Sequence, residues 1–209
     1  MTAADSAPAW REWARYLLAL RGLPPRVALF LWRARRHAAR SGDLFSLASA
    51  IRPAEVAVLL ELARGRVRVI ELGTGTGWSA IALALDDPER RVTTYDPTVR
   101  PERDAYFAMV SAAVRRRVEL RNEPDVAGPG PGESAELLFI DSAHDRESVL
   151  AAFGAWHGAL MPGALVAFHD YGHPQFPGVR EGILELALDG QGRGGMFIWR
   201  APDSAVFNA

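Results

Sequence analysis

Hydrophobic and polar positions follow two different periods along the chain, which divide it into a helical start and a mixed remainder. Residues 1 to about 65 keep a helical period, with Trp13, Leu17 and Leu20 about one turn apart and "LPP" at 23–25 as a break. The segment "RPAEVAVLLELARG" at 52–65 has proline near its start and Gly65 at its stop, which predicts a helix leading into a strand. We expect residues 1–50 to form a helical cap or lid.

After residue 65, short apolar runs alternate with helical patterns. Strands are predicted at 67–72, 91–95, 117–121, 136–140, 164–169, 196–200 and 204–208, and helices at 77–86, 101–115, 143–159 and 178–188. The turn-rich segment at 123–134 predicts a crossover with a reduced or missing helix. This alternation predicts an α/β fold, a doubly wound Rossmann-like sheet with helices on both faces, over residues 51–209.

Composition excludes several classes of protein and site. The 209 residues are 49% hydrophobic and 23% charged, which is typical of a globular protein with one substantial core. A net charge of -1 gives no general attraction to nucleic acid or to membranes, and we expect neither as a partner. Without cysteine, disulfides, cysteine-bound zinc and thiol nucleophiles are excluded. No signal-peptide pattern opens the chain, which favours a cytoplasmic location.

The stretch "RVIELGTGTGWSAIALAL" at 68–85 places a glycine-rich turn between a strand and a helix, where a ligand can approach the backbone closely. Gly73, Gly75 and Gly77 alternate, unlike the G-x-G-x-x-G fingerprint, and this disfavours NAD or FAD. All 24 basic residues are arginines, so the lysine of a phosphate-binding P-loop is missing. Glu71 would repel a pyrophosphate but suits a cationic ligand such as S-adenosylmethionine.

The ends of the predicted strands are unusually polar, and ligands of open parallel sheets bind at this edge. Asp96 follows the glycine turn by about one βα unit, where a carboxylate can hydrogen-bond a ribose diol. Alternatively, Asp96 is a turn residue before Pro97. Asp141 ends the strand in "ELLFIDSAHD", and Asp170 follows the strand in "ALVAFHDY".

These motifs together resemble class I S-adenosylmethionine-dependent methyltransferases, with the resemblance covering about residues 50–208. More narrowly, the chain is similar to small bacterial metal-dependent O-methyltransferases of the catechol and macrolide-sugar types, which place D-x-x-H after one strand and an acidic pair after the next. A P-G-V element then follows, here "FPGVREGI". The resemblance implies S-adenosylmethionine as cofactor and a hydroxylated small molecule of secondary metabolism as acceptor. It implies cofactor contacts at Glu71, Gly73, Thr74, Gly75, Gly77, Trp78, Ser79, Asp96 and Asp141.

A divalent cation, Mg²⁺ or Mn²⁺, is the second expected cofactor. Asp141 and Asp170 end strands that should be neighbours, so their carboxylates could converge on a hard cation, with His169 beside them. The related enzymes commonly have an acid where this chain has His169, and imidazole is a poorer ligand for Mg²⁺ than for Mn²⁺. Alternatively, Asp141 only ends a buried strand, Ser142 and Asp145 cap the next helix, and His169 is a satisfied core histidine.

His144 is the expected general base, because methylation of oxygen requires loss of the hydroxyl proton and the chain has neither lysine nor cysteine. It lies three residues after Asp141, in the first turn of the predicted helix, where the positive helix end would lower its pKa. The sugar O-methyltransferases that the chain resembles have a histidine base at this position. Alternatively, His144 is a partly exposed residue at a helix start. His173 is a second candidate for substrate contact.

Three questions stay open at the level of sequence. The arginine cluster from Arg33 to Arg40 could grip an acidic substrate or partner, but we favour a solvated helix face. The N-terminal helices could form a lid or a homodimer contact. Besides an O-methyltransferase, the fold could serve a noncatalytic cofactor-binding scaffold, or an enzyme that binds the cofactor without transferring methyl.

Overall fold

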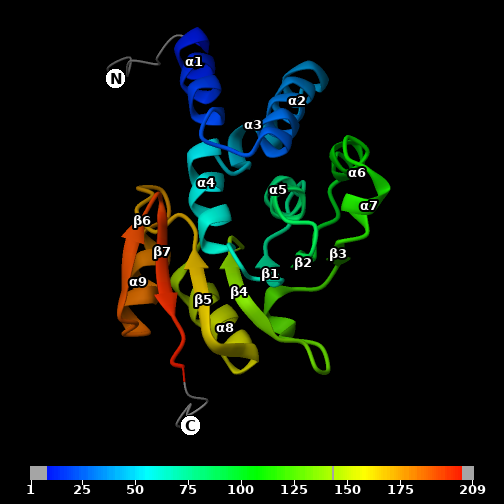
Figure 1. Cartoon of the computed structure of the whole chain (residues 1–209). Helices are drawn as coiled ribbons and strands as arrows, with labels where there is room; N and C mark the ends of the chain where they lie inside the picture. The colour runs from blue at the N-terminus through cyan, green and yellow to red at the C-terminus, as the bar shows by residue number, and fades with distance from the viewer. Residues whose placement is uncertain (1–8, 143, 204–209) are drawn as a thin grey trace, which may run out of the picture.

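The computed structural model describes residues 9–142 and 144–203, which form a sheet flanked by helices (Figure 1). The strands are β1 Arg68–Leu72, β2 Arg91–Tyr95, β3 Val118–Arg121, β4 Ala135–Ile140, β5 Leu160–Phe168, β6 Gly190–Arg193 and β7 Met196–Arg200. The helices are α1 Ala9–Leu20, α2 Pro25–Ser41, α3 Leu44–Ser49, α4 Pro53–Leu62, α5 Trp78–Asp86, α6 Arg103–Phe107, α7 Ala112–Arg115, α8 Arg146–Trp156 and α9 Pro177–Glu185, with short 3₁₀ turns at Asp125–Ala127 and His157–Ala159.

The sheet has the strand order β3-β2-β1-β4-β5-β7-β6. Strands β1 to β5 are parallel, which confirms the predicted doubly wound α/β fold. β7 runs antiparallel to β5, and β6 pairs antiparallel with β7. The reversal of strand order at β1 and β4 places their carboxyl ends beside a crevice, which is where ligands of such sheets bind.

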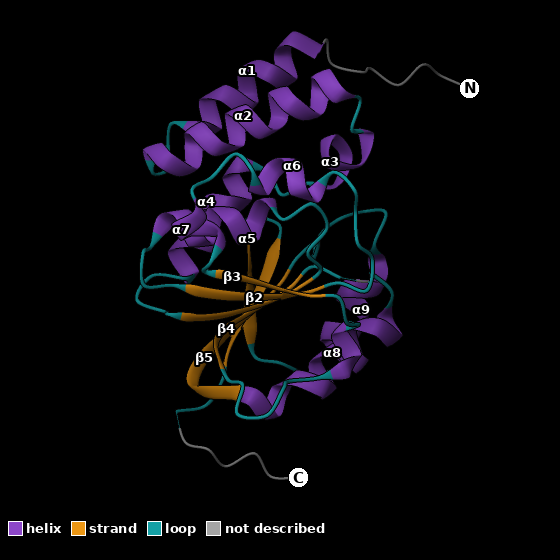
Figure 2. Cartoon of the chain, turned by 90° about the vertical axis from the view of Figure 1, so that its right-hand side faces the viewer, coloured by secondary structure: helices purple, strands orange, loops and turns teal. Residues whose placement is uncertain are grey.

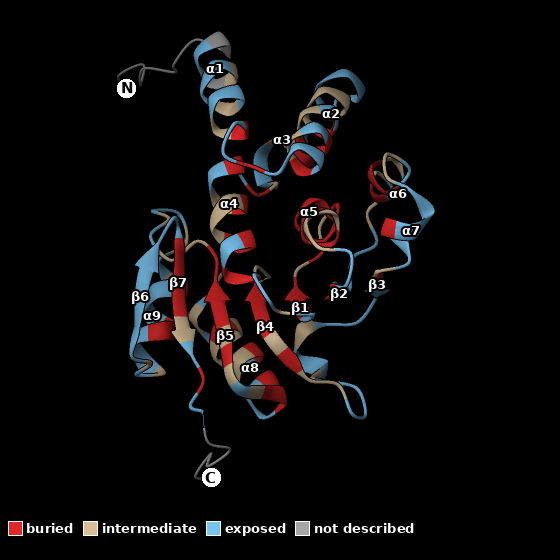
Figure 3. Ribbon diagram, viewed as in Figure 1, coloured by how far each residue is buried: buried red, intermediate tan, exposed pale blue. Residues whose placement is uncertain are grey.

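Helices cover both faces of the sheet (Figure 2). Alternate residues of the central strands point to opposite faces: Val69 joins the core beneath α4 and α5, whereas Ile70 joins the core beneath α8 and α9. The central strands are therefore buried on both sides, as Figure 3 shows, and this explains their nearly continuous apolar sequences.

The N-terminal helices form an outer layer over α4 and α5 (Figures 1 and 2). Val27, Phe30 and Leu31 of α2 are buried and belong to the same core cluster as the residues of α5. Residues 1–8 lie outside the described part of the chain. The division at residue 50 stays a prediction. Among the described helices, none is long and apolar enough to cross a bilayer.

Some predicted element boundaries were wrong for local reasons. The helix expected at 101–115 is divided into α6 and α7, because Ser111 has extended backbone and caps α7 through the N–H of Val114. The helix expected from residue 143 begins at Arg146, because Asp145 is its N-cap. β6 was not predicted, since "GQGR" is exposed throughout and has no apolar alternation. The strand predicted at 204–208 lies outside the described residues.

Candidate functional site

The turn between β1 and α5 needs its glycines. Gly73, Gly75 and Gly77 all have positive φ angles, of 101°, 51° and 85°. A Cβ on Gly73 would lie 2.0 Å from the carbonyl oxygen of Asp141, so no larger residue fits between β1 and β4. The N–H of Gly75 donates to Oδ2 of Asp96 over 2.8 Å. The turn is thereby held against the ends of both neighbouring strands.

A cavity of about 660 Å³ opens over this turn at the carboxyl ends of the strands. The predicted cofactor residues that line it are Gly73, Thr74, Gly75, Gly77, Trp78, Ser79, Asp96 and Asp141. His144, His169, Asp170 and His173 line the same cavity. The residues singled out from the sequence thus surround one space of a size typical for small-molecule sites.

Glu71 is the predicted cofactor residue that does not line the cavity, because it is fully buried behind the glycine turn. Thr94 Oγ1 donates to one of its carboxylate oxygens over 2.5 Å, and the other oxygen, Oε1, has no hydrogen-bond partner. Burial raises the pKa of Glu71 to about 7, and the negative charges of Asp141 and Asp96 act in the same direction. A buried acid with an unsatisfied oxygen needs a positive group nearby to ionise fully.

Asp96 holds the loop that follows β2. Besides the N–H of Gly75, its carboxylate accepts the N–H of Thr98 over 2.7 Å. Arg103, only 3% exposed, lies 4.0 Å from this carboxylate and donates to the carbonyl oxygens of Gly75 and Thr98. Sequence reasoning missed Arg103, because an arginine inside a helical pattern normally indicates a solvated face. The side chain of Asp96 remains 15% exposed at the cavity.

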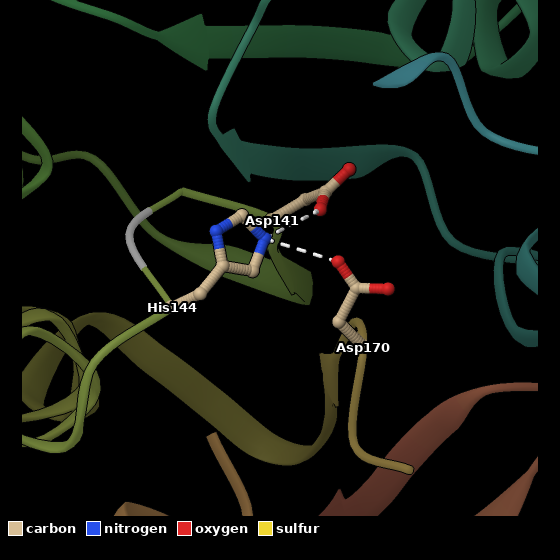
Figure 4. Close-up of side chains that lie close together, drawn as sticks. All are labelled: Asp141, His144 and Asp170. Atoms are coloured by element: carbon tan, nitrogen blue, oxygen red, sulfur yellow. Dashed lines mark ion pairs between the residues drawn. The ribbon is translucent and has the colours of Figure 1, made fainter. Parts of the chain in front are cut away.

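Asp141, His144 and Asp170 converge at the opposite part of the cavity (Figure 4). Nε2 of His144 lies 3.0 Å from Oδ2 of Asp170 and 4.0 Å from Oδ1 of Asp141. One potential ligand atom from each residue lies within 4.8 Å of the other two. Two carboxylates and one imidazole at this spacing could hold a divalent cation of the Mn²⁺ or Zn²⁺ type.

His169 lies beside this group and forms a hydrogen bond with Asp141. Its Nδ1 is 2.8 Å from Oδ1 of Asp141, and its Nε2 is 3.5 Å from Oε2 of Glu55. Burial opposes protonation of His169, but the carboxylates of Asp141, Asp170 and Glu55 outweigh burial and raise its pKa to about 12. His144 supplies the nitrogen of the converging group, and His169 as a ligand stays a prediction.

Asp170 is held in an unusual conformation at the end of β5. Its φ angle is +58°, a left-handed conformation that aspartate tolerates better than most residues. Burial opposes its ionisation, but hydrogen bonds from His144 and His169 outweigh burial and lower the pKa of Asp170. Asp170 thus carries a negative charge that faces both imidazoles.

His144 precedes α8, so its predicted place in the first helical turn was wrong. Asp145 caps this helix by accepting the N–H of Ser148 over 2.9 Å. Ser142 takes no part in the cap, since its hydroxyl donates to Asp125 over 2.6 Å. The proposed joint cap of Ser142 and Asp145 is therefore also wrong.

Aromatic packing fixes the ring of His144. It stacks on Phe176 with ring centroids 4.2 Å apart, and Phe176 in turn stacks on His173 at 4.8 Å. Phe176 comes from the "FPGV" element at the start of α9, and both of its stacking partners line the cavity. The loop after β5 thus supplies two of these rings, His173 and Phe176, and the loop after β4 supplies the third, His144.

Several further lining residues were missed from the sequence, among them Asp125, Phe45 and Glu55. Asp125 follows β3, and applying the strand-end rule to that strand would have identified it. Phe45, from α3, would lie 3.5 Å from a Cβ on Gly75, so the helical cap reaches the glycine turn. Glu55 was missed as a cavity residue because it also serves the start of α4, where its carboxylate accepts the N–H of Arg52 over 2.8 Å.

Comparisons with known proteins agree with this geometry. Residues 70–171 match the model of a family described as a methyltransferase domain. In structure, the chain is similar to the O-methyltransferase TomG of Streptomyces achromogenes, solved with S-adenosylmethionine, with a TM-score of 0.57 and 23% identity over 78% of this chain and 86% of TomG. It is also similar to CalS11, a TDP-rhamnose 3′-O-methyltransferase of calicheamicin biosynthesis, with a TM-score of 0.56 and 18% identity over 94% and 96% of the two chains.

Curated relatives that are similar in sequence include a mouse protein and the ribosomal RNA large subunit methyltransferase G of Pseudomonas fluorescens, which is 29% identical over 92 residues that cover 44% of this chain and 24% of that relative. The catechol O-methyltransferase domain-containing protein 1 of mouse is 29% identical over 107 residues, which cover 48% of this chain. The chain spans only 40% of the length of that relative. At identities below 25%, the two structural similarities show a shared Rossmann-like methyltransferase fold.

Proposed function

We propose that this chain, whose residues 70–171 match the model of a methyltransferase domain, transfers the methyl group of S-adenosylmethionine to a hydroxyl of a small molecule. The observation that carries this proposal is the single cavity that joins the glycine turn to the group of Asp141, His144 and Asp170. One end suits the cofactor, and the other end can remove a proton from an acceptor.

The residues present fit the proposed cofactor. A Cβ at Gly73 would close the approach to the backbone, and Asp96 presents a carboxylate to the cavity where a ribose diol could hydrogen-bond. Glu71 has an unpaired buried oxygen below the turn, so a positive charge placed above the turn would favour its ionised form. When bound, the cofactor supplies a reactive methyl group on a positively charged sulfur.

His144 is the proposed base. To act as base, His144 must carry its own proton on Nδ1 and accept the proton of the acceptor hydroxyl on Nε2, which lies 3.0 Å from Oδ2 of Asp170. The imidazolium so formed would donate to Asp170, whose negative charge would stabilise it. Phe176 holds the ring by stacking. The chain would otherwise act by orienting the acceptor and excluding water, since the methyl donor is intrinsically reactive.

Alternatively, a divalent cation makes the acceptor hydroxyl more acidic. Asp141, His144 and Asp170 would hold it, and a bound cation would lower the pKa of the acceptor hydroxyl. The two roles of His144 exclude each other, because one lone pair on Nε2 cannot bind both a metal and a proton. We propose Mn²⁺ ahead of Mg²⁺, because the group contains an imidazole.

The acceptor class and the setting are also proposals. TomG and CalS11 act in the synthesis of tomaymycin and calicheamicin, and this supports a hydroxylated acceptor of bacterial secondary metabolism. We further propose that the chain forms a homodimer through α1, on which Leu17 and Leu18 are 44% and 63% exposed. Light scattering of wild type and Leu18→Gln tests this, and a wild-type monomer at micromolar concentration would contradict it.

The test of function is transfer of labelled methyl from S-adenosylmethionine to phenolic, sugar and polyketide acceptors, with and without EDTA. We expect a labelled ether product from at least one hydroxylated acceptor. Loss of activity in EDTA and its return with Mn²⁺ would assign the metal, whereas full activity after exhaustive chelation would assign proton removal to His144 alone. Cofactor binding without transfer to any acceptor of these classes would contradict the proposed activity.

A further inference from the structure

A second hollow lies between α2 and the turn after α6, separate from the cavity described above. Its volume is about 290 Å³, and it is lined by Trp32, Arg33, Arg36, His37, Arg40 and Met109. The five residues from α2 form one stripe, because positions three, four and seven apart share a helix face. No residue lines both hollows.

Three arginines of this groove have no acidic partner among the described residues. Arg90, Arg146 and Arg193, by contrast, each pair with carboxylates elsewhere in the described residues. Arg33, Arg36 and Arg40 form neither a salt bridge nor a side-chain hydrogen bond within residues 9–142 and 144–203. Positive charges this close on one helix repel one another, so a bound anion would reduce this repulsion.

Asp43 cannot neutralise the groove. Asp43 lies close enough to interact electrostatically with His37, but it is only 6% exposed. Its carboxylate already accepts the N–H of Ser46 and the hydroxyl of Tyr106. The wider surroundings are also basic, since residues 1–50 contain eight arginines and three acidic residues.

The side chain of Arg36 is partly ordered before any ligand arrives. The guanidinium of Arg36 lies over the ring of Trp32, 4.6 Å from its centroid. His37 packs edge-on against Tyr106, with ring centroids 5.6 Å apart. Such contacts reduce the entropy lost on binding, which distinguishes this groove from arginines that extend freely into solvent.

We propose that this groove binds a small phosphorylated molecule carrying at least two negative charges. Planar guanidinium groups match phosphate oxygens in pairs, and three of them along one stripe suit a phosphate or pyrophosphate better than a single carboxylate. The volume, near the lower limit of about 300 Å³ for small-molecule sites, admits such a group and little more. The proposal gives a binding role to a face that the sequence predicts to be solvated.

Calorimetric titration with inorganic pyrophosphate at constant ionic strength tests the proposal. We expect saturable binding to wild type, at least about tenfold weaker in Arg36→Gln/Arg40→Gln, because each lost arginine removes charge-assisted hydrogen bonds. Arg180→Gln, at an exposed arginine on α9, is the matched control and should bind like wild type. Thermal melting verifies that the double variant is folded, and since these residues are partly or fully exposed we expect it to be.

Three results would overturn the proposal. The first is no saturable binding of pyrophosphate to the wild type. The second is unchanged binding of pyrophosphate in the double variant. Loss of binding in Arg100→Gln would then place the pyrophosphate in the larger cavity, which Arg100 lines. The third is binding of heparin but not of pyrophosphate, which would indicate a surface for extended polyanions. None of these results bears on methyl transfer.

Discussion

Replacing Glu71 by glutamine should stabilise the cofactor-free protein at alkaline pH. Glu71 is fully buried, and the pKa of its carboxyl group is raised from an ordinary value of 4.5 to about 7. Because the folded state prefers the protonated acid, its contribution to stability is complete below about pH 4.5 and is lost as pH rises through about 7. Glutamine stays neutral and avoids this loss.

The size of the effect follows from the two pKa values. At about 1.36 kcal/mol per pH unit, ionising Glu71 in the folded protein costs roughly 3 kcal/mol in total, of which roughly 2 to 3 kcal/mol falls between pH 5 and pH 8. The difference in free energy of unfolding between Glu71→Gln and wild type should therefore move in favour of the variant by that amount. If the glutamine amide is imperfectly hydrogen-bonded, it lowers the free energy of unfolding of the variant equally at pH 5 and pH 8. This cost therefore cancels when the two pH values are compared.

Urea unfolding at pH 5 and pH 8, without cofactor, measures this difference directly. Glu89→Gln, at an exposed glutamate, is the matched control, and its difference from wild type should be the same at both pH values. A difference for Glu71→Gln that changes by less than about 0.5 kcal/mol between the two pH values would refute the assignment of a buried, weakly ionised acid.

Other substitutions test the remaining parts of the site. Asp96→Asn should weaken binding of S-adenosylhomocysteine by about 1.5 to 3 kcal/mol in calorimetry, because charge-assisted hydrogen bonds to the ribose are lost, and an unchanged dissociation constant would contradict that role. Gly73→Ala should destabilise the fold by more than about 3 kcal/mol, since its Cβ would meet the backbone of Asp141 at 2.0 Å, whereas Gly132→Ala, with open space around it, should cost only about 1 kcal/mol in the same urea assay. His144→Ala should lower kcat by about 10² to 10⁴-fold in the labelled-methyl assay, while binding of S-adenosylhomocysteine is nearly unchanged. Wild-type turnover in this variant would show that His144 is not the general base. Binding of S-adenosylhomocysteine to wild type should strengthen by up to about tenfold from pH 6 to pH 8 as Glu71 ionises, with no such gain in Glu71→Gln.

The sequence predicted the fold well where local pattern and tertiary packing agree. The apolar runs of β1, β2 and β4 and the glycine turn were placed within one or two residues, because buried parallel strands have nearly continuous apolar sequences. β6 escaped prediction because it pairs with β7 across Gly194 and Gly195, and no side-chain pattern in the sequence records that pairing.

The sequence predicted which strand-end residues line the candidate site, but not which partners each side chain contacts. Residues at strand ends converge because parallel strands share one edge, which placed Asp96, Asp141 and Asp170 in a single cavity. The partners of each imidazole could not be predicted, since His169 is turned toward Asp141 by packing within the fold. Glu55 was beyond reach for the same reason, because only the tertiary fold brings α4 beside β5.

The most direct test of the central claim is calorimetric titration of the wild-type protein with S-adenosylhomocysteine and, separately, with NAD. The cavity over Gly73, Gly75 and Gly77 should bind one S-adenosylhomocysteine per chain, and should bind it more tightly than NAD. Absence of heat with both S-adenosylhomocysteine and S-adenosylmethionine, or tighter binding of NAD, would contradict the account.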